Sequence, residues 1–387
     1  MRLLFLLAIA LPVAGQPALS DGARAYLVTM TPGDALYSAW GHTGIRIQDE
    51  IAGIDVVYNF GTFDFRTPNF YTKFVRGQLD YELSRAAYAR VVRAYAYEER
   101  GLSLQRLNLS PTQVQQLFTL LEVNFQPENR AYRYSFLFDN CATRPRDAIE
   151  AVTGDTLQTE DTPPTSFRSL LHQYLDPYPW AAFGIDLALG RPVDRIATPR
   201  ERLFLPYELR DAVASARLPN QPLAEPEQVV IPPPEPEEAG FVPTPLLAWT
   251  LLLAAGIAFA FFAGPRLNLA FDAVLFTLAG FGGLLLLFLW FGTEHGVTEQ
   301  NWNAIWLLPA HLIALPLTSG SRKDAAGSRV YWMLSAGLAG LAVLWALSGW
   351  GPQVLPMSGA PLMMLLAFRS GRRAAVQSEP VSAPETT

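Results

Sequence analysis

The chain has 387 residues, a formal net charge of -6 and one cysteine. The acidic balance and the absence of a basic stripe with interleaved aromatics argue against nucleic acid as a partner. A single cysteine excludes an intramolecular disulfide, and the sequence has no CxxC or HExxH motif, so we expect neither a metal nor another cofactor.

The first 15 residues predict a secretory signal peptide. Arg2 is followed by the short apolar run LLFLLAIALPVAG, which ends in small residues, and we expect cleavage near Gly15. An uncleaved anchor helix is the alternative, although the run is shorter than the ~20 residues that span a bilayer. Both interpretations place the next domain, residues 16–220, outside the cytoplasm.

A β-hairpin is predicted early in this exported domain. The segments YSAWGHTGIRIQ (37–48) and DVVYNFGTFDF (55–65) are rich in β-branched and aromatic residues, and Gly53 lies in the hinge between them. His42 begins the first strand. The expected register places Asn59 of the second strand near His42.

An aromatic segment, residues 60–81, ends the hairpin region. It contains Phe63, Phe65, Phe70, Tyr71, Phe74 and Tyr81, with the cations Arg66, Lys73 and Arg76 among them. Core packing with a solvated face is one interpretation. The other is an apolar slot for acyl chains with cations for a phosphate headgroup.

The segment YRYSFLFDNCATRPRDAIEAV (132–152) predicts a helix that starts at the cysteine. Asn140 is a favourable N-cap, and the residues after it have helical spacing. Cys141 would then lie at the helix N-terminus, where backbone N–H groups, the helix dipole and nearby Arg144 favour an anion. We therefore expect a lowered thiol pKa.

A nucleophilic thiol needs a base, and the base needs a group that orients it. Cys141 and His42 supply the first two if the fold brings them together, and Asn59, Asp55 or Asp64 is expected to orient the imidazole. An inert buried cysteine and a structural histidine are the alternatives. The histidine precedes the cysteine, an order that fits an α+β domain of circularly permuted papain-like, NlpC/P60-like type.

The C-terminal third of the chain predicts an all-α transmembrane bundle. Residues 221–244 are rich in Pro, Glu and Gln and predict an extended linker. Residues 245–368 then contain five apolar stretches, and a tail, 369–387, follows. The five predicted helices are 245–263, 269–292, 303–317, 330–349 and 353–368.

Loop charges predict the orientation of this bundle. Lys and Arg occur in the first loop (Arg266), in loop 318–329 and in the tail, whereas loops 293–302 and 350–352 have none. Because cytoplasmic loops carry the excess of Lys and Arg, the N-terminal domain is expected in the periplasm and the C-terminus in the cytoplasm. The chain would thus be a bacterial inner-membrane protein.

Several of these segments resemble the Lnb family of bacterial lipoprotein N-acyltransferases. They are WGHTGIRI, YNFGTFDF, FDNCATRPRD and FGTEHGVTEQNWNAIWLLP (291–309). The resemblance covers nearly the whole chain. It implies transfer of an acyl chain from a membrane phospholipid to the N-terminal amine of a diacylglyceryl-cysteine lipoprotein through a thioester, with Cys141 and His42 as the catalytic pair.

We expect six residues around this pair to bind substrate: Trp40, Asn140, Arg144, Glu294, His295 and Asn301. The last three lie in a loop that either is an ordinary polar turn or packs against the soluble domain. Two other functions stay open, a membrane-tethered thiol amidase or peptidase acting on peptidoglycan and a non-catalytic binding module for envelope assembly. A five-helix anchor is excessive for the first, and the second leaves the Asn–Cys helix start and the upstream histidine unexplained.

Overall fold

The computed structural model of the protein describes residues 18–160, 162–235, 242–316, 325–356 and 359–378. The predicted signal peptide lies outside these ranges. The chain forms two compact units, each of which is described by itself. The described residues of the first fall within Met1–Tyr71, Leu79–Pro164 and Ala197–Pro236, and those of the second within Thr72–Gln78, Thr165–Ile196 and Glu237–Thr387.

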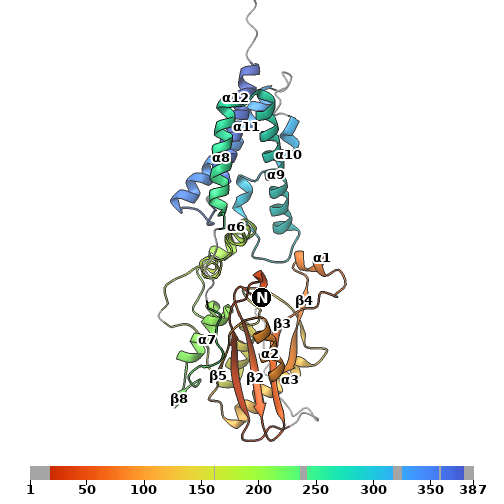
Figure 1. The fold of residues 1–387 in the computed structure, drawn as a ribbon, viewed down its shortest axis with the longest axis vertical. Coiled ribbons are helices and arrows are strands. Elements are labelled where there is room, and N and C mark those ends of the chain that lie inside the picture. Colours follow the sequence, from red (N-terminus) through yellow and green to blue (C-terminus); the bar gives the residue numbers. More distant parts are fainter. Residues whose placement is uncertain (1–17, 161, 236–241, 317–324, 357–358, 379–387) are drawn as a thin grey trace, which may run out of the picture. The chain divides into compact units, whose positions relative to one another are not determined.

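The first unit is built on an antiparallel sheet of seven strands in the order β6-β4-β3-β2-β1-β5-β9 (Figure 1). The predicted hairpin is present as β2 and β3, with His42 as the first residue of β2. The strands are β1 (Arg24–Met30), β2 (His42–Asp49), β3 (Ile54–Thr62), β4 (Asp80–Ala87), β5 (Leu102–Arg106), β6 (Ala131–Arg133) and β9 (Gln228–Ile231).

Helices cover both faces of this sheet. On one face, α3 (Pro111–Phe125), α4 (Thr143–Thr153) and α7 (Pro206–Ser215) close a core that includes Ile45, Ile47 and Tyr58. On the other face, α2 (Tyr88–Tyr97) packs near Val57 and Met30. Successive residues of a strand point to opposite faces, so Tyr58 faces the α4 side of the sheet and Val57 the α2 side.

Part of the predicted linker, residues 221–244, forms a strand. Gln228–Ile231 form β9, which pairs with the edge strand β5, and β7 (Arg217–Leu218) and β8 (Gln221–Pro222) form a short ribbon just before it. The run QVVI has β-branched residues and no proline, so it can add to the open edge of β5. Because Pro- and Glu-rich residues flank this strand on both sides, the composition of the whole segment predicted a linker.

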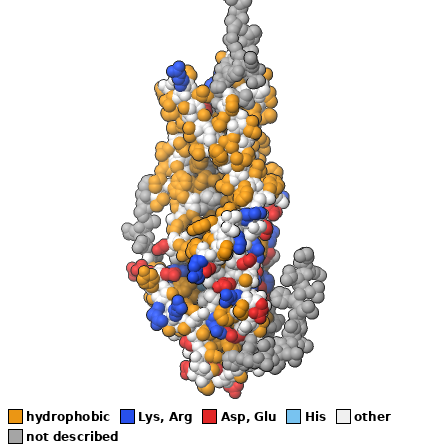
Figure 2. Space-filling view, turned by 90° about the vertical axis from the view of Figure 1, so that its right-hand side faces the viewer, with side chains coloured by type: hydrophobic (Ala, Val, Ile, Leu, Met, Phe, Trp, Pro, Cys, Tyr) orange, Lys and Arg blue, Asp and Glu red, His pale blue; other side chains and the backbone are white. Residues whose placement is uncertain are grey.

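The second unit contains three helices that are long and apolar enough to cross a membrane, among the residues described. They are α8 (Pro245–Phe262), α9 (Pro265–Phe291) and α11 (Ala325–Ser348). Hydrophobic side chains dominate the surface of these helices (Figure 2).

The other two predicted spans differ from long apolar helices. The stretch 303–317 is broken into a 3-10 turn, η4 (Trp302–Ile305), and a short helix, α10 (Ala310–Ala314). Pro309 immediately precedes α10 and cannot donate a backbone hydrogen bond. Of the described residues in the fifth stretch, 353–368, only residues 360–368 are helical, and they open α12 (Ala360–Ser378), which continues into the predicted tail.

Glycines of α9 allow the broken segment to pack directly against the backbone of this helix. A Cβ at Gly283 would lie 2.0 Å from the carbonyl oxygen of Leu307, and one at Gly280 would lie 2.6 Å from the Leu312 side chain. Asn303 accepts backbone hydrogen bonds from Trp306 and Leu307 within the same segment. Irregular backbone at membrane depth is tolerated when protein buries it and satisfies its polar groups.

A buried ion cluster explains why α12 extends past its apolar stretch. Asp272 of α9 is fully buried and pairs with both Arg369 and Arg373 of α12. Arg369 also donates to the side-chain oxygen of Asn268 at 2.8 Å. These arginines fall in the predicted tail, 369–387, yet they are part of the helical packing.

The remaining helices of the second unit come from the first half of the chain. They are α5 (Phe167–His172) and α6 (Pro179–Ala188), followed by the 3-10 helix η2 (Arg191–Asp194). Helix α6 packs on α8 and α9, and its carbonyl groups accept hydrogen bonds from Asn301 and Asn303. The compact units therefore do not follow the predicted boundary between residues 16–220 and 245–368.

Candidate thiol site

Asn140 holds the turn that carries the cysteine. Its side-chain oxygen accepts from the backbone N–H of Ala142 at 2.8 Å and of Thr143 at 2.9 Å. Its side-chain nitrogen donates to the carbonyls of Phe136 and Phe204 at 2.7 and 2.9 Å. The helix proper starts at Thr143, so Cys141 lies in the turn directly before α4.

The thiol of Cys141 reaches the start of the hairpin. It is within hydrogen-bonding reach of the backbone N–H of Thr43, the residue after His42, and of its own N–H. The Cβ of Cys141 is 3.6 Å from where a Cβ would stand on Gly61 of β3. Gly61 has φ +89° at a register shift between β3 and β4, a backbone that favours glycine.

His42 is hydrogen-bonded to the side chain of Asn59. Gly44 makes room for this contact, because a Cβ at that position would lie 3.1 Å from the Asn59 side-chain oxygen and 3.0 Å from the Tyr58 carbonyl oxygen. Gly41, on the other side of His42, has φ +79°. The two glycines of the GHTG sequence thus shape the backbone and the space around the imidazole.

The other two candidates for orienting His42 are engaged elsewhere. Asp55 forms a bidentate ion pair with Arg46, at 2.7 and 2.9 Å. Asp64 pairs with the neighbouring exposed side chain of Arg66. Of the three predicted candidates, the structure therefore brings only Asn59 to the imidazole.

Both reactive side chains are neutral in this environment. Burial and, to a smaller extent, the charge of Arg100 outweigh the hydrogen bond with Asn59 and together lower the pKa of His42 to about 4. Burial outweighs the opposing effects of the N–H groups of Thr43 and Cys141 and of the Arg100 charge, so the pKa of the Cys141 thiol is raised to about 11. No hydrogen bond joins this thiol to the imidazole in the part of the chain described.

The expected lowering of the thiol pKa is therefore wrong for this conformation. Two effects explain the difference. Asn140 occupies the N–H groups of Ala142 and Thr143, which a thiolate would otherwise use, and desolvation disfavours the charged form. Of the N–H groups around this turn, the one on Cys141 itself remains directed at the sulfur.

Arg100 is a residue that the sequence did not single out. Its guanidinium is almost fully buried, donates to the carbonyl of Thr31 at 2.9 and 2.8 Å and pairs with Glu98 at 3.1 Å. Its charge acts on both His42 and Cys141. Nothing in its local sequence, EERGL, marks it, because the contact depends on the pairing of β1 with β5.

Two of the predicted substrate-binding side chains have structural partners in the first unit. Trp40 is buried, with its ring 4.9 Å from that of Phe136. Arg144 forms a bidentate ion pair with Asp139, at 2.6 and 2.9 Å, and its guanidinium lies 3.5 Å from the centre of the Tyr132 ring.

The loop residues predicted to bind substrate lie in the second unit. Glu294 accepts from the side chain of Gln78 at 2.6 Å, and His295 contacts the carbonyl of Val75 at 3.0 Å. Asn301 is buried, and its side-chain nitrogen donates to the carbonyls at the end of α6. The loop is therefore ordered by segments 72–78 and 165–196, which precede the membrane helices in the chain.

An aromatic ladder extends from the cysteine turn. We define it as Tyr134, Tyr81, Phe63 and Phe65, in that order. Tyr134 contacts the Gly61 position, Tyr81 stacks on Tyr134 with ring centres 4.2 Å apart, and Phe63 lies 5.4 Å from Tyr81. Phe65, at the end of the ladder, is 64% exposed.

No cluster of metal-binding side chains occurs in the described ranges.

Comparison with protein families decides the identity of both halves. Residues 18–173 match the model of the Lnb N-terminal periplasmic domain, and residues 236–379 match that of the Lnb transmembrane domain. The chain belongs to the Lnb family. No curated protein and no solved structure matches it.

The Lnb assignment confirms the resemblance seen in the sequence and gives a membrane protein with a periplasmic N-terminal domain. Within the first matched region, the Lnb chain carries His42, Asn59 and Cys141. The second region includes the polar loop with Glu294 and His295. The candidate thiol site thus belongs to the periplasmic part of this Lnb protein.

Proposed function

We propose that this protein transfers an acyl chain from a membrane phospholipid to the N-terminal amine of a diacylglyceryl-cysteine lipoprotein, through a thioester at Cys141. Membership of the Lnb family is consistent with this reaction. The observation that carries the proposal is the convergence of the cysteine turn on the start of β2, where His42 bonds Asn59.

In the first half-reaction the thiol attacks the ester carbonyl of the phospholipid. His42 accepts the thiol proton as the sulfur–carbon bond forms. The backbone N–H of Cys141 stabilises the oxyanion. The ester carbon–oxygen bond then breaks, His42 returns the proton to the departing alkoxide, and a lysophospholipid leaves.

In the second half-reaction the neutral amine of the lipoprotein attacks the thioester. An amide forms as the carbon–sulfur bond breaks, and His42 takes a proton from the attacking nitrogen and gives it to the sulfur. The pKa of about 4 keeps His42 unprotonated at neutral pH, as a base requires. Because the thiol pKa is about 11, the thiolate forms during attack and is not stored at rest.

The aromatic ladder supports a lipid substrate. Its rings contact one another in sequence from the exposed Phe65 to Tyr134, which contacts the Gly61 position beside Cys141. A hydrocarbon chain on this surface would bring its ester toward the thiol. A peptide of the cell wall has no comparable need for such a surface.

The test uses the purified full chain and a phospholipid labelled in its acyl chain. We expect label on Cys141 in a hydroxylamine-sensitive thioester, and its transfer to a diacylglyceryl-cysteine peptide. Cys141→Ala and Cys141→Ser should form no thioester, and His42→Ala should lose at least about a hundredfold in rate. Undiminished transfer by Cys141→Ala would reject the thioester route, and peptide release from peptidoglycan would favour an amidase.

A further inference from the structure

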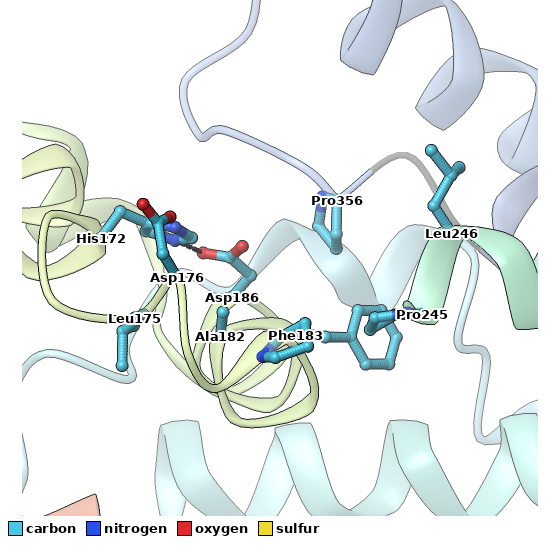
Figure 3. A pocket seen from close by; sticks show the side chains of 10 residues that line it. His172, Leu175, Asp176, Ala182, Phe183, Asp186, Pro245, Leu246 and Pro356 are labelled. Carbon is cyan, nitrogen blue, oxygen red and sulfur yellow. Dashed lines mark hydrogen bonds and ion pairs between the residues drawn. The ribbon is translucent and has the colours of Figure 1, made fainter. Parts of the chain in front are cut away.

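The second unit contains a cavity of about 350 Å³ that the thiol mechanism does not use (Figure 3). Its polar wall consists of His172, Asp176 and Asp186. Its other wall is apolar and includes Phe183 and Leu246. The cavity therefore combines carboxylates with a surface suited to hydrocarbon.

The charges around the cavity favour a cation. Asp186 accepts from both His172 and the buried Arg168 at 2.9 Å, and Asp194 neutralises the same guanidinium at 2.8 Å. The exposed carboxylate of Asp176 makes no hydrogen bond to any residue in the described ranges. The three carboxylates outnumber the cations even when His172 is protonated, and its bond to Asp186 raises the pKa of that histidine.

Helix α6, which forms one side of the cavity, has the character of an interfacial helix. Its sequence PWAAFGIDLA is strongly apolar, yet none of its residues is buried. Trp180 donates to the carbonyl of Pro243 just before α8, and Phe183 lies 6.2 Å from Trp249 of α8. Trp180 and Gly184 are exposed and the rest of the helix is half-buried, and lipid stabilises the apolar surface that such a helix leaves uncovered.

We propose that this cavity binds the primary ammonium group of a lipid, with its carboxylates facing the charge and its apolar wall facing the hydrocarbon. This assignment to a substrate rests on the proposed function. Two substrates of that reaction can carry such a group, an aminophospholipid donor and the lipoprotein acceptor. An anionic lipid headgroup without an amine is disfavoured by the same carboxylates.

A cross-linking experiment tests binding without relying on catalysis. The full chain in phosphatidylcholine nanodiscs is labelled with a long-chain primary amine that carries a diazirine, and the linked peptides are mapped by mass spectrometry. We expect labelling of residues 172–186 that the free amine competes and its N-acetyl derivative does not. Equal competition by the acetamide, or labelling only elsewhere, would overturn the proposal.

Matched variants sharpen this test. Asp176→Asn removes a charge without removing a hydrogen bond, and Ala182→Phe fills the cavity without changing its charge. Asp176→Asn should reduce labelling by about fivefold, the order of one exposed charge contact, and Ala182→Phe should reduce it by excluding the amine from the cavity. Glu299→Gln, an exposed carboxylate in the same unit but outside the cavity, should leave labelling unchanged. Wild-type labelling in both cavity variants would also reject the site.

The two half-reactions then identify the source of the ammonium group. If the cavity holds the donor, Asp176→Asn slows thioester formation from phosphatidylethanolamine and leaves that from phosphatidylglycerol unchanged. If it holds the acceptor, both thioesters form normally and only transfer to the diacylglyceryl-cysteine peptide slows. Unchanged rates in all three assays would reject a substrate site. Absence of a thioester in the wild type would instead refute the proposed function, because cross-linking is scored separately.

Discussion

At the scale of single residues, the thiol and the imidazole are both neutral, and this state predicts the pH dependence of alkylation. With a thiol pKa of about 11 and a histidine pKa of about 4, the thiolate fraction rises with pH throughout the range 6–9. The rate of Cys141 labelling by iodoacetamide should therefore climb about tenfold per pH unit across that range. Mass spectrometry of the full chain gives this rate.

The single cysteine makes that measurement specific, because Cys141→Ser serves as a blank. A thiolate–imidazolium pair of the kind found in many thiol enzymes would instead give a labelling rate that is flat above the thiol pKa. A plateau between pH 6 and 9 would show that the neutral pair is not the resting state.

Asn59 bonds the His42 imidazole and Gly44 leaves room for that bond, so substitution of either residue should lower kcat. Asn59→Ala removes the hydrogen bond to His42, and Gly44→Ala places a methyl group 3.1 Å from the Asn59 oxygen. We expect kcat to fall about tenfold to a hundredfold in the first and less in the second, since an imidazole without its orienting partner spends less time in position.

Gly22→Ala is the matched control for the second substitution. A Cβ there meets only the Ser20 hydroxyl at 3.6 Å, an ordinary contact. Thermal unfolding of all three variants separates a loss of orientation from a loss of fold. Normal kcat in Asn59→Ala would remove Asn59 from the mechanism and leave its role structural.

At the scale of elements, the cap of α4 links stability to the position of the thiol. Asn140→Ala removes the acceptor for two N–H groups at the start of α4 and the donor for one buried and one half-buried carbonyl. We expect a loss of at least about 1–2 kcal/mol in stability. Activity should fall further than stability accounts for, because the Cys141 turn is no longer fixed.

Ser110→Ala tests whether any lost cap has this effect. Ser110 caps α3 in a capping box with Gln113 and its loss should cost about 1 kcal/mol. Its variant should be less stable in thermal unfolding yet transfer acyl chains at the normal rate. Equal loss of activity in the two cap variants would mean that Asn140 acts only through global stability.

The elements that sequence predicted well are those fixed by local chemistry. The hairpin follows from alternating β-branched residues around Gly53. Asn140 does bind the N–H groups next to it, but α4 starts two residues later than predicted, at Thr143, with Ala142 as its N-cap. Strand β9 escaped prediction because QVVI becomes a strand only through β5, more than a hundred residues earlier. The broken segment at Pro309 escaped because the Gly280 and Gly283 face that receives it lies on another helix.

The same distinction applies to the candidate site. The sequence identified Cys141 and His42 as candidates because each is a reactive residue type next to a recognisable helix start or strand start. The choice of Asn59 followed from the register of the hairpin. The direction of the thiol pKa did not follow, since it depends on desolvation by the whole fold and on which N–H groups Asn140 occupies. Arg100 could not be identified from the sequence either, because its effect on the site also depends on the tertiary fold.

At the scale of the whole molecule, the two units are built from segments that alternate along the chain. The chain passes from the first unit into the second at residues 72–78, again at 165–196 and finally after residue 236. Each compact unit is therefore built from segments that are not contiguous in the chain. Residues early in the chain help to order the loop and helix ends of the membrane unit, as the bonds of Asn301 to α6 show.

The orientation of that membrane unit depends on its shortest segment. The N-terminal domain is periplasmic, so we expect α8 to run inward and α9 to run outward. Helix α11 can then start on the cytoplasmic side only if the segment containing η4 and α10 crosses the membrane. If it turns back instead, α12 would carry Arg369, Arg372 and Arg373 to the periplasmic side, against the positive-inside rule.

We therefore expect a crossing and a cytoplasmic C-terminus. A green fluorescent protein fused after Thr387 should fluoresce, and alkaline phosphatase fused at the same place should be inactive. Alkaline phosphatase inserted near Pro233 should be active, as a positive control in the same chain. Active phosphatase after Thr387 would mean that the segment around Pro309 is re-entrant, because the chain would then cross the membrane an even number of times. The glycine face of α9 would in that case receive a loop that returns to the side from which it came.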